Sequence, residues 1–384
     1  MASHRWIWEH PDWPGFTWDM ARLASTMAAA RRAQGELAGA ARLLDAQLQT
    51  RAGADLLLQD ALGTSHIEGE HPNPDGVRSS IARHLGLPHA GLPVPERATE
   101  GLVEVLLDAT RRYRAPLTLE RLCAWQAALF PEGRPLLRPV RAGQLRGEEP
   151  MRVVSGPIEH EKVHYEAVPR RRLEAELDRF LAWFAQPPSD LDGLLRAGLA
   201  HLWFELIHPF EDGNGRVGRA LMDMALAQDE RRSLRLFSLS AQFMRDRSHY
   251  YVLLEQAGRA ELEVTDWLLW FLEQVQVACV SAQSTLAAVL AKARFWMHYG
   301  ASALNERQRK VLNRLLDAGP DGFEGGMSTR KYVGLTKVSR ATAFRELAQM
   351  VELGCIAPTA TKGRSAAYEI DWVRWVSTGS GEAQ

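Results

Sequence analysis

The stretch "HPFEDGNGRVGR", from His208 to Arg219, decides how this chain is interpreted. It holds one histidine, two carboxylates, three small turn residues and two arginines in twelve positions. Its "DGNG" could form a hairpin turn. However, the flanking segments "LDGLLRAGLAHLWFELI" and "RALMDMALAQ" are helical in pattern and do not alternate as strands do. The stretch is therefore predicted to be the loop between two helices, the first of which is apolar nearly all round and buried.

Backbone chemistry predicts an anion site in this loop. Pro209 biases His208 away from helical geometry, which ends the first helix and presents the imidazole at a fixed place. Gly213, Asn214 and Gly215 can adopt positive φ at little cost, so that successive N–H groups point into one concavity. The next helix starts immediately, and its N-terminus faces the same spot.

The charged side chains of the loop indicate phosphate chemistry. Arg216 and Arg219 are one helical turn apart and can converge on one ligand. Asp212 can hold a Mg²⁺ that bridges phosphates. His208 is the group here that titrates near neutrality, which suits a general base. Together they predict a nucleotide phosphate site beside a base; the alternative is an ordinary structural loop.

These twelve residues resemble the full signature of the Fic family, H-x-F-x-[DE]-G-N-G-R-x-x-R, at every specified position. The resemblance implies transfer of AMP from ATP to a Ser, Thr or Tyr hydroxyl of a protein. His208 would deprotonate the hydroxyl and Asp212 would hold Mg²⁺. The turn from Gly213 to Gly215 would cradle the α- and β-phosphates, and Arg216 and Arg219 would bind the β- and γ-phosphates. Phosphorylating relatives carry lysine at the position of Gly215, so the glycine favours nucleotidyl transfer.

A second motif, "TSHIEGE", lies far upstream. Thr64 and Glu68 fall on one face in the last turn of a predicted helix that Gly69 ends. A carboxylate there opposes the helix dipole, which suggests a cationic partner; a solvated glutamate is the alternative. The segment resembles the Fic inhibitory motif [ST]-x-x-x-E-[GN]. The resemblance implies that Glu68 pairs with Arg219, so that ATP would bind unproductively.

Two further segments are expected to complete the site. Val153 and Val154, then Val163 to Tyr165 with His164, predict two short strands around a turn. The resemblance implies a flap that docks the target by strand addition; a purely structural hairpin is the alternative. His160 and His164 are interpreted as surface histidines. The stretch "RDRSHYYVLLEQA" resembles the region that closes over the adenine in the family, which makes Tyr250 and Tyr251 the candidates for adenine contact. Tyr251 is preferred, and core packing of one of the two is the alternative.

The last 80 or so residues have a different character. A helix, a helix–turn–helix with Ser339 as a cap, and two strands around a Lys362–Arg364 turn predict a winged-helix module. Arg340, Arg345 and Arg364 would make its DNA contacts, although Glu346 and Glu352 interrupt the basic surface. Such modules also bind proteins or dimerise, and a homodimer is a further possibility.

The expected fold class is mainly α. It comprises a Fic-type helical core with a β-hairpin flap, an N-terminal helical inhibitory region and a C-terminal winged helix-turn-helix. The N-terminal arm and inhibitory region are expected at residues 1–98, and the catalytic core at residues 99–285. A linker helix with the winged helix is expected at residues 286–376, followed by a disordered tail at residues 377–384.

Composition agrees with a globular protein of 384 residues with a net charge of −1, which does not point to nucleic acid or membrane. Three distant cysteines fit a reducing compartment. No stretch is expected to span a membrane, no apolar signal core is seen, and a cytoplasmic location is predicted. The tryptophan-rich N-terminus is interpreted as an arm that docks on the body.

Three functions remain open at this point. The first is an autoinhibited protein adenylyltransferase that uses ATP and Mg²⁺ on an unnamed target protein or on itself. The second is removal of AMP from a modified protein by the same site, with Glu68 orienting water. The third is a DNA-binding regulator whose core senses nucleotide.

Overall fold

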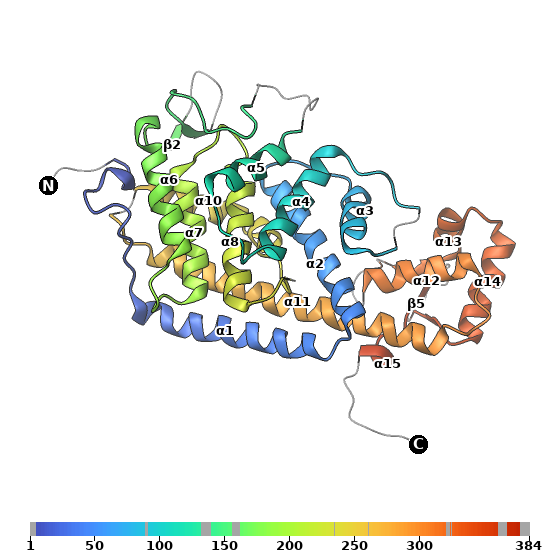
Figure 1. Ribbon diagram of the computed structural model, residues 1–384. Coiled ribbons are helices and arrows are strands. Elements are labelled where there is room, and N and C mark those ends of the chain that lie inside the picture. The colour runs from blue at the N-terminus through green and yellow to red at the C-terminus, as the bar shows by residue number, and fades with distance from the viewer. Residues whose placement is uncertain are drawn as a thin grey trace. The chain divides into compact units, whose positions relative to one another are not determined.

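A computed structural model describes most of the chain (Figure 1). The described residues are 5–88, 91–131, 140–155, 162–233, 235–259, 261–319, 323, 325–359 and 367–376. They form two compact units: the first comprises Met1–Arg42 and Gly53–Ala282, and the second comprises Leu43–Ala52 and Gln283–Gln384. The predictions for the hairpin turn with His160, for Lys362 and Arg364, and for the tail at 377–384 lie outside the described residues.

The first unit is mainly helical. Its elements are the 3-10 helix η1 (Ile7–Glu9), α1 (Met20–Arg42), α2 (Ala46–Ile67) from Gly53 onward, α3 (Pro74–Leu85), α4 (Arg97–Arg111), α5 (Leu119–Leu129), β1 (Arg152–Ser155), β2 (Lys162–Glu166), α6 (Arg170–Ala185), α7 (Gly193–Ile207), α8 (Asn214–Glu230), α9 (Leu239–Arg245), α10 (Arg247–Arg259) and α11 (Thr265–Tyr299) as far as Ala282. The sequence from Asp19 to Gln49 has a helical pattern without proline and predicts one continuous helix, but α1 ends at Arg42 and α2 begins at Ala46. A continuous pattern of good helix formers conceals this break, because propensity alone does not locate tertiary bends.

Helices α7 and α8 form the centre of this unit. Helix α8 packs against α7, α4 and α5 (Figure 1). The apolar pattern of α7 correctly predicted its burial, since almost all of its side chains are buried. Its N-terminus is fixed by Asp192, whose carboxylate accepts a hydrogen bond from Leu194 N. The pair α7–α8 therefore holds the connecting loop on a rigid base.

The N-terminal arm docks on the body of the first unit. Trp6 and Trp13 are 4% and 3% exposed. The indole of Trp6 meets Tyr165 edge to face with ring centroids 5.5 Å apart. The indole N–H groups of Trp8 and Trp13 donate to Glu166 O at 2.7 Å and to Glu176 Oε2 at 2.9 Å. These contacts tie the arm to β2, a strand of the hairpin, and to α6, the helix that follows it.

Strands β1 and β2 form an antiparallel hairpin with an irregularity in register between Val153 and Val154. Both valines are exposed, at 38% and 39%. His164, interpreted as a surface histidine, is partly exposed at 22%, and its Nδ1 lies 2.6 Å from Glu255 Oε2 on α10. This contact joins the hairpin to α10.

The second unit has its own hydrophobic core. It contains the end of α11 with α12 (Glu306–Ala318), β3 (Met327–Ser328), α13 (Thr329–Thr336), α14 (Arg340–Glu352), β4 (Ala357–Pro358), β5 (Ala367–Glu369) and α15 (Val373–Val376). The strands form an antiparallel sheet in the order β3-β5-β4. Ser339 caps α14, as its hydroxyl accepts a hydrogen bond from Thr342 N.

Helix α11 is the one helix in the described part of the chain that is long and apolar enough to cross a membrane. The sequence led us to expect no membrane-spanning stretch, and α11 is a candidate by length and composition only. Within the first unit, however, α11 supplies core side chains such as Trp267, Leu268 and Phe271, which are 2% exposed or less. A buried core helix passes the same test of length and composition.

Candidate functional site

The loop between α7 and α8 turns sharply at its first residue. His208 has a φ of 52°, the left-handed region, and its N–H still bonds to Phe204 O. This conformation ends α7 at Ile207, two residues before Pro209, and agrees with the bias of a proline against helical geometry in the residue before it. Phe210 is fully buried and anchors the loop in the core. The imidazole is thus placed by the backbone and by the packing of the next apolar side chain.

The turn uses glycine at one position only. Gly213 has a φ of 86°, whereas Asn214 and Gly215 are already the first residues of α8. The expectation of positive φ at all three positions is therefore wrong for Asn214 and Gly215. The Asn214 side chain holds the loop instead, since its Oδ1 accepts from Phe210 N at 2.9 Å and its Nδ2 donates to Phe210 O at 2.8 Å. The N-terminus of α8 consequently opens directly onto the loop.

His208 has the properties of a neutral base. Its Nδ1 lies 3.2 Å from the carbonyl oxygen of Glu205, which can only accept a hydrogen bond. Nδ1 therefore carries the proton, and the lone pair lies on Nε2. Desolvation lowers the pKa of His208 to about 4, so the imidazole is neutral at physiological pH. Arg146 fixes the backbone here, since its Nε donates to His208 O at 2.8 Å and its own N–H donates to Pro209 O.

Arg219 is fully enclosed by contacts from α2. Its Nε donates to Thr64 Oγ1 at 2.7 Å, and its Nη2 donates to Thr64 O at 3.2 Å. The same Nη2 lies 2.5 Å from Glu68 Oε1. Glu68 follows the last turn of α2, and Gly69, with a φ of 78°, ends the helix. The structure thus brings together the two motifs that are 151 positions apart, at Glu68 and Arg219.

The charge of Glu68 is stabilised in this position. Burial alone would raise the pKa of its carboxyl, but the positive charges of Arg219 and Arg216 outweigh burial and lower it. Gly215 makes room for the carboxylate: a Cβ added there would lie 2.3 Å from Glu68 Oε1 and 2.9 Å from Arg219 Nη1. A side chain at position 215 and Glu68 in this position therefore exclude each other.

A second carboxylate contacts the other arginine of the loop. Glu70 Oε2 lies 3.0 Å from Arg216 Nη1, and the Arg216 side chain is 4% exposed. Asp212 is further away, with its Oδ1 3.8 Å from Arg216 Nη2. Both arginines assigned to phosphates thus contact glutamates from the segment that follows α2. The sequence did not single out Glu70, although it ends the quoted "TSHIEGE" stretch, because the motif specifies only one carboxylate, that of Glu68.

Asp212 fits the role of a metal ligand by its position. Its side chain is 53% exposed, and its Oδ1 accepts from Gly213 N at 2.6 Å. A carboxylate oriented by the backbone beside a helix N-terminus suits a hard cation that also contacts phosphate. Gln126 supports the turn from α5 by donating to Asp212 O at 3.2 Å. Sequence reasoning missed Gln126 and Arg146, which are distant in sequence and belong to no motif.

Beneath Arg219 lies a buried cluster from α7 and α10. The Oε1 of Glu205 is buried and has no hydrogen-bond partner among the described residues. It would lie 2.6 Å from a Cβ at Gly218. Burial raises the pKa of Glu205 to about 8, against the lowering effect of Arg219. His201 Nε2 lies 2.8 Å from the hydroxyl of Tyr250, which makes Tyr250 a core residue.

Tyr251 is placed differently from Tyr250. It is 40% exposed, and its hydroxyl donates to Ile67 O at 3.2 Å, directly before Glu68. Its ring is thus accessible at the edge of the site, while adenine contact stays a prediction. Arg340 and Arg345 lie on α14 in the second unit.

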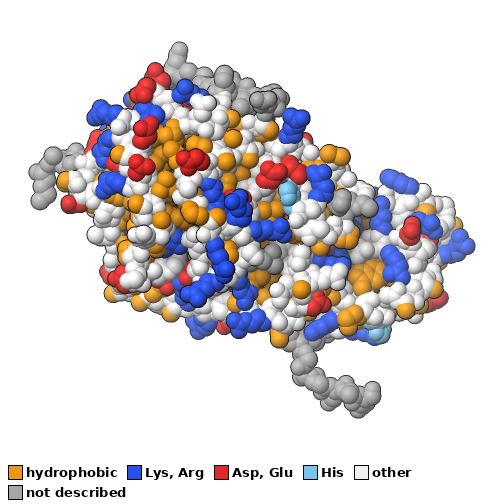
Figure 2. Space-filling view, viewed as in Figure 1, with side chains coloured by type: hydrophobic (Ala, Val, Ile, Leu, Met, Phe, Trp, Pro, Cys, Tyr) orange, Lys and Arg blue, Asp and Glu red, His pale blue; other side chains and the backbone are white. Residues whose placement is uncertain are grey.

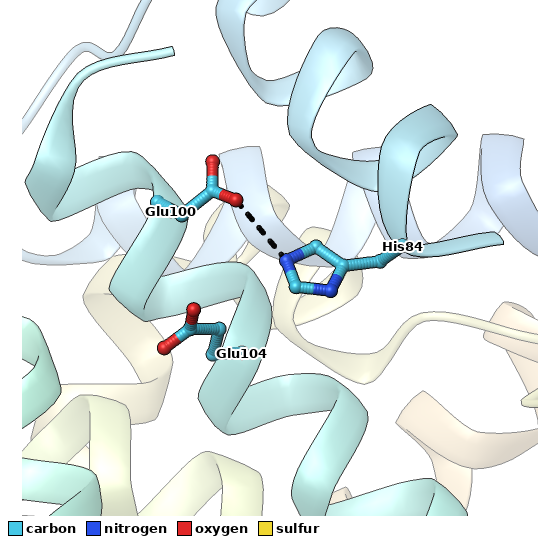
Figure 3. A group of neighbouring side chains, drawn as sticks. All are labelled: His84, Glu100 and Glu104. Atoms are coloured by element: carbon cyan, nitrogen blue, oxygen red, sulfur yellow. Dashed lines mark ion pairs between the residues drawn. The ribbon is translucent and has the colours of Figure 1, made fainter. Parts of the chain in front are cut away.

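One cluster of possible metal ligands lies elsewhere, at the contact of α3 and α4 (Figure 3). The ligand atoms of His84, Glu100 and Glu104 are within 4.8 Å of one another. Glu100 already pairs with Arg83 at 2.7 Å and lies 3.2 Å from His84 Nε2. These neighbours account for its charge, so the group is an ion-pair cluster at the surface.

Comparison with known proteins agrees with this architecture. Residues 6–87 match a family model described as a domain of unknown function, DUF4172. Residues 116–226, which include the loop, match the Fic/DOC family model. The chain is similar to the crystal structure of a Fic family protein from Desulfovibrio desulfuricans G20, with 18% identity and a TM-score of 0.54; the match covers 96% of this chain and 99% of that one.

A second similar structure is that of a Fic domain containing signaling protein from Bacteroides thetaiotaomicron VPI-5482. It has 15% identity and a TM-score of 0.50, and the match covers 68% of this chain and 96% of that one. At identities of 15% and 18%, the similarity to these two solved structures shows the fold alone. The match to the Fic/DOC family model covers the region that contains the loop. The chain has a mainly helical, Fic-like fold, and residues 116–226 form a domain of the Fic/DOC family.

Proposed function

We propose that this chain is a protein adenylyltransferase that Glu68 holds in an inhibited state. The donor would be ATP with Mg²⁺, and the acceptor a Ser, Thr or Tyr hydroxyl of another protein or of the chain itself. The observation that carries the proposal is the arrangement around Arg219. Arg219, a buried arginine at the end of the phosphate loop, contacts Thr64 and Glu68. His208, at the start of the same loop, is neutral and can act as a base.

His208 is assigned the proton transfer. Its Nε2 would take the proton of the target hydroxyl as that oxygen attacks the α-phosphorus, and the bond to the pyrophosphate oxygen would break. The hydrogen bond from Nδ1 to Glu205 O orients the ring for this step. Because its pKa is about 4, the imidazole is in the basic form across the physiological range.

The phosphates are assigned to the N-terminus of α8. Its first N–H groups, with Gly213 and Arg216, would bind the α- and β-phosphates, and Arg219 would bind the γ-phosphate. Asp212 would hold Mg²⁺, which neutralises charge on the phosphates when bound. Catalysis at such a site depends mainly on positioning and charge neutralisation.

Inhibition would follow because Glu68 and Glu70 occupy the guanidinium groups of Arg219 and Arg216 that the phosphates of ATP need. A γ-phosphate cannot contact Arg219 in its productive geometry while Glu68 lies 2.5 Å from Nη2. Release would require Glu68 to leave Arg219, and Glu70, two residues later in the same segment, to leave Arg216. The exposed valines Val153 and Val154 on β1 suit a target segment that adds to the hairpin as a strand.

The C-terminal unit supports a winged-helix assignment. Helices α12, α13 and α14 with the sheet β3-β5-β4 follow the order of such a module. We propose a cytoplasmic location for the chain, on the three unpaired cysteines Cys123, Cys279 and Cys355.

The chemistry is tested with ATP labelled at two positions. The Glu68→Gly protein is incubated with Mg²⁺ and ATP carrying label in either the α- or the γ-phosphate. We expect protein-bound label from α-labelled ATP only, and none when His208→Ala is added. Label from γ-labelled ATP would show phosphoryl transfer and contradict the proposal, as would equal α-label in the His208→Ala protein.

A further inference from the structure

Helix α14 in the second unit has one buried face and one exposed face. Ala343, Leu347 and Met350 lie in the core of this unit. Arg340, Ala341, Phe344 and Arg345 are exposed on the other side of the helix. Phe344 is 63% exposed, which is unusual for an aromatic side chain in the middle of a helix. The exposed face thus combines two arginines with an apolar ring.

The charge around this face is strongly positive. Residues 327–351 contain five cations, of which Arg330, Lys337, Arg340 and Arg345 are exposed, and one carboxylate, that of Glu346. The difference is +4, since five positive charges oppose one negative charge. In Figure 2, Lys and Arg side chains predominate over Asp and Glu where Figure 1 places α12 to α14. A chain with a net charge of −1 therefore concentrates positive charge here.

The one carboxylate does not interrupt this surface. The sequence suggested that Glu346 weakens the basic face, which is wrong: Glu346 is 7% exposed and points inward. Its Oε1 lies 2.5 Å from Arg307 Nη2, and its Oε2 accepts from Tyr332 OH at 2.6 Å. Burial would raise the pKa of Glu346, but the bonds from Arg307 and Tyr332 outweigh it and lower the pKa. The remaining glutamate, Glu352, lies at the C-terminal end of the helix.

The turn before α14 directs a helix N-terminus to the same side. Lys337 has a φ of 58° and ends α13, and Ser339 caps α14. Arg340 is the first residue of the helix, so the exposed arginine coincides with the positive end of the helix dipole. The charge of Arg340 and the N-terminus of α14 both favour an anionic partner. A row of phosphates along this surface would also reach Arg330 on α13 and Lys337 in the turn.

We propose that the exposed face of α14 binds the major groove of duplex DNA, a function separate from nucleotidyl transfer. Arginine reads guanine edges and phenylalanine contacts the thymine methyl group, and both side chains occur here one helical turn apart. Arg330 and Lys337 would contact the phosphates on either side, which fix the helix in the groove. Duplex RNA is excluded as the preferred partner, because its major groove is too narrow for a helix.

Binding is tested by fluorescence anisotropy with the full-length protein and labelled 30-base-pair DNA of mixed sequence, between 50 and 200 mM salt. Two phosphate contacts, from Arg330 and Lys337, predict a slope of log K against log salt of about −1.8. Arg340→Ala with Arg345→Ala should weaken binding about tenfold or more with little change of slope, because these arginines are assigned to base edges. Arg330→Ala with Lys337→Ala should instead reduce the slope by about 1.8. The matched control is Arg32→Ala with Arg42→Ala, which removes two exposed arginines from α1 and should leave binding unchanged.

The role of Phe344 needs a different readout. Sequences selected from a random DNA pool should differ between the wild-type protein and Phe344→Ala, while the salt slope stays the same, because an apolar ring contacts bases and not phosphates. Circular dichroism checks that each variant is folded. The proposal is overturned by no DNA binding at 50 mM salt, by equal loss in the control pair, or by equal affinity for duplex RNA. If the exposed face of α14 instead binds a protein that covers Phe344, no DNA binding is expected at 50 mM salt.

Discussion

At the scale of single residues, the site is defined by carboxylates that contact the phosphate-loop arginines. Glu68 was expected from its motif, and its contact with Arg219 is present in the structure. The contact of Glu70 with Arg216 was not expected. The motif at the end of α2 predicts where the side chain of Glu68 points, but it does not predict the side chains of the loop that follows. Arg146 and Gln126 are also invisible to motif reasoning, since they reach the loop from distant elements.

Glu70 offers a prediction about nucleotide affinity. In the Glu68→Gly background, Glu70→Gln should lower the Kd for ATP with Mg²⁺ about three- to tenfold, because Arg216 no longer has a competing carboxylate. The effect is modest since Glu70 is 34% exposed. Titration calorimetry measures it, and Glu36→Gln, on the exposed side of α1, serves as control. Equal Kd values with and without Glu70 would show that this contact does not oppose ATP.

Glu205 offers a prediction about pH. Its folded pKa of about 8 is raised above the unfolded value, so the stability that it contributes is complete below pH 4.5 and is lost as pH rises towards 8. Glutamine cannot ionise, so Glu205→Gln should become more stable relative to wild type between pH 5 and pH 8, by about 3 kcal/mol. Urea unfolding followed by tryptophan fluorescence measures this difference. Parallel stability curves would mean that Glu205 titrates normally.

At the scale of elements, the pattern of the sequence was informative where it was local. The apolar run of α7, the hairpin of β1 and β2 and the capped α14 all appear where their residues predicted them. Local patterns failed where packing decides: the break between α1 and α2, the φ values of Asn214 and Gly215, and the inward turn of Glu346. For Glu346 the partner, Arg307, lies 39 positions away, whereas the side chain of Asn214 is bonded to the backbone of Phe210 within the same loop.

The position of α2 should control the inhibition. Gly63 lies one residue before Thr64, and a Cβ there would be 2.5 Å from Ala241 N at the start of α9. Gly63→Ala should therefore push α2 away, destabilise the fold by about 1–3 kcal/mol and raise automodification. Gly39→Ala on α1 meets nothing within 4 Å and should instead stabilise the protein by about 0.5–1 kcal/mol.

Thermal unfolding and AMP incorporation are measured on both glycine variants. Loss of stability in Gly63→Ala without any gain of automodification would show that the docking of α2 on α9 does not hold Glu68 in place.

At the scale of the whole molecule, the sequence predicted a mainly helical chain with a Fic-like core, and the fold agrees. The two units have separate cores, one around α7 and α8 and one around α12 to α14. The boundary between them could not be predicted in full, because residues 43–52 belong to the second unit although they lie early in the chain. Residues 43–52 have no sequence pattern of their own that would assign them to the second unit.

The central claim is that Glu68 restrains an otherwise competent transferase. Intact-mass spectrometry of the full chain after incubation with ATP and Mg²⁺ tests it most directly, on the wild type, Glu68→Gly, and Glu68→Gly with His208→Ala. The account predicts a mass gain of one or more AMP groups in Glu68→Gly, little in the wild type, and none in the double variant. Equal AMP incorporation by the wild type and Glu68→Gly, or incorporation that persists without His208, would contradict it.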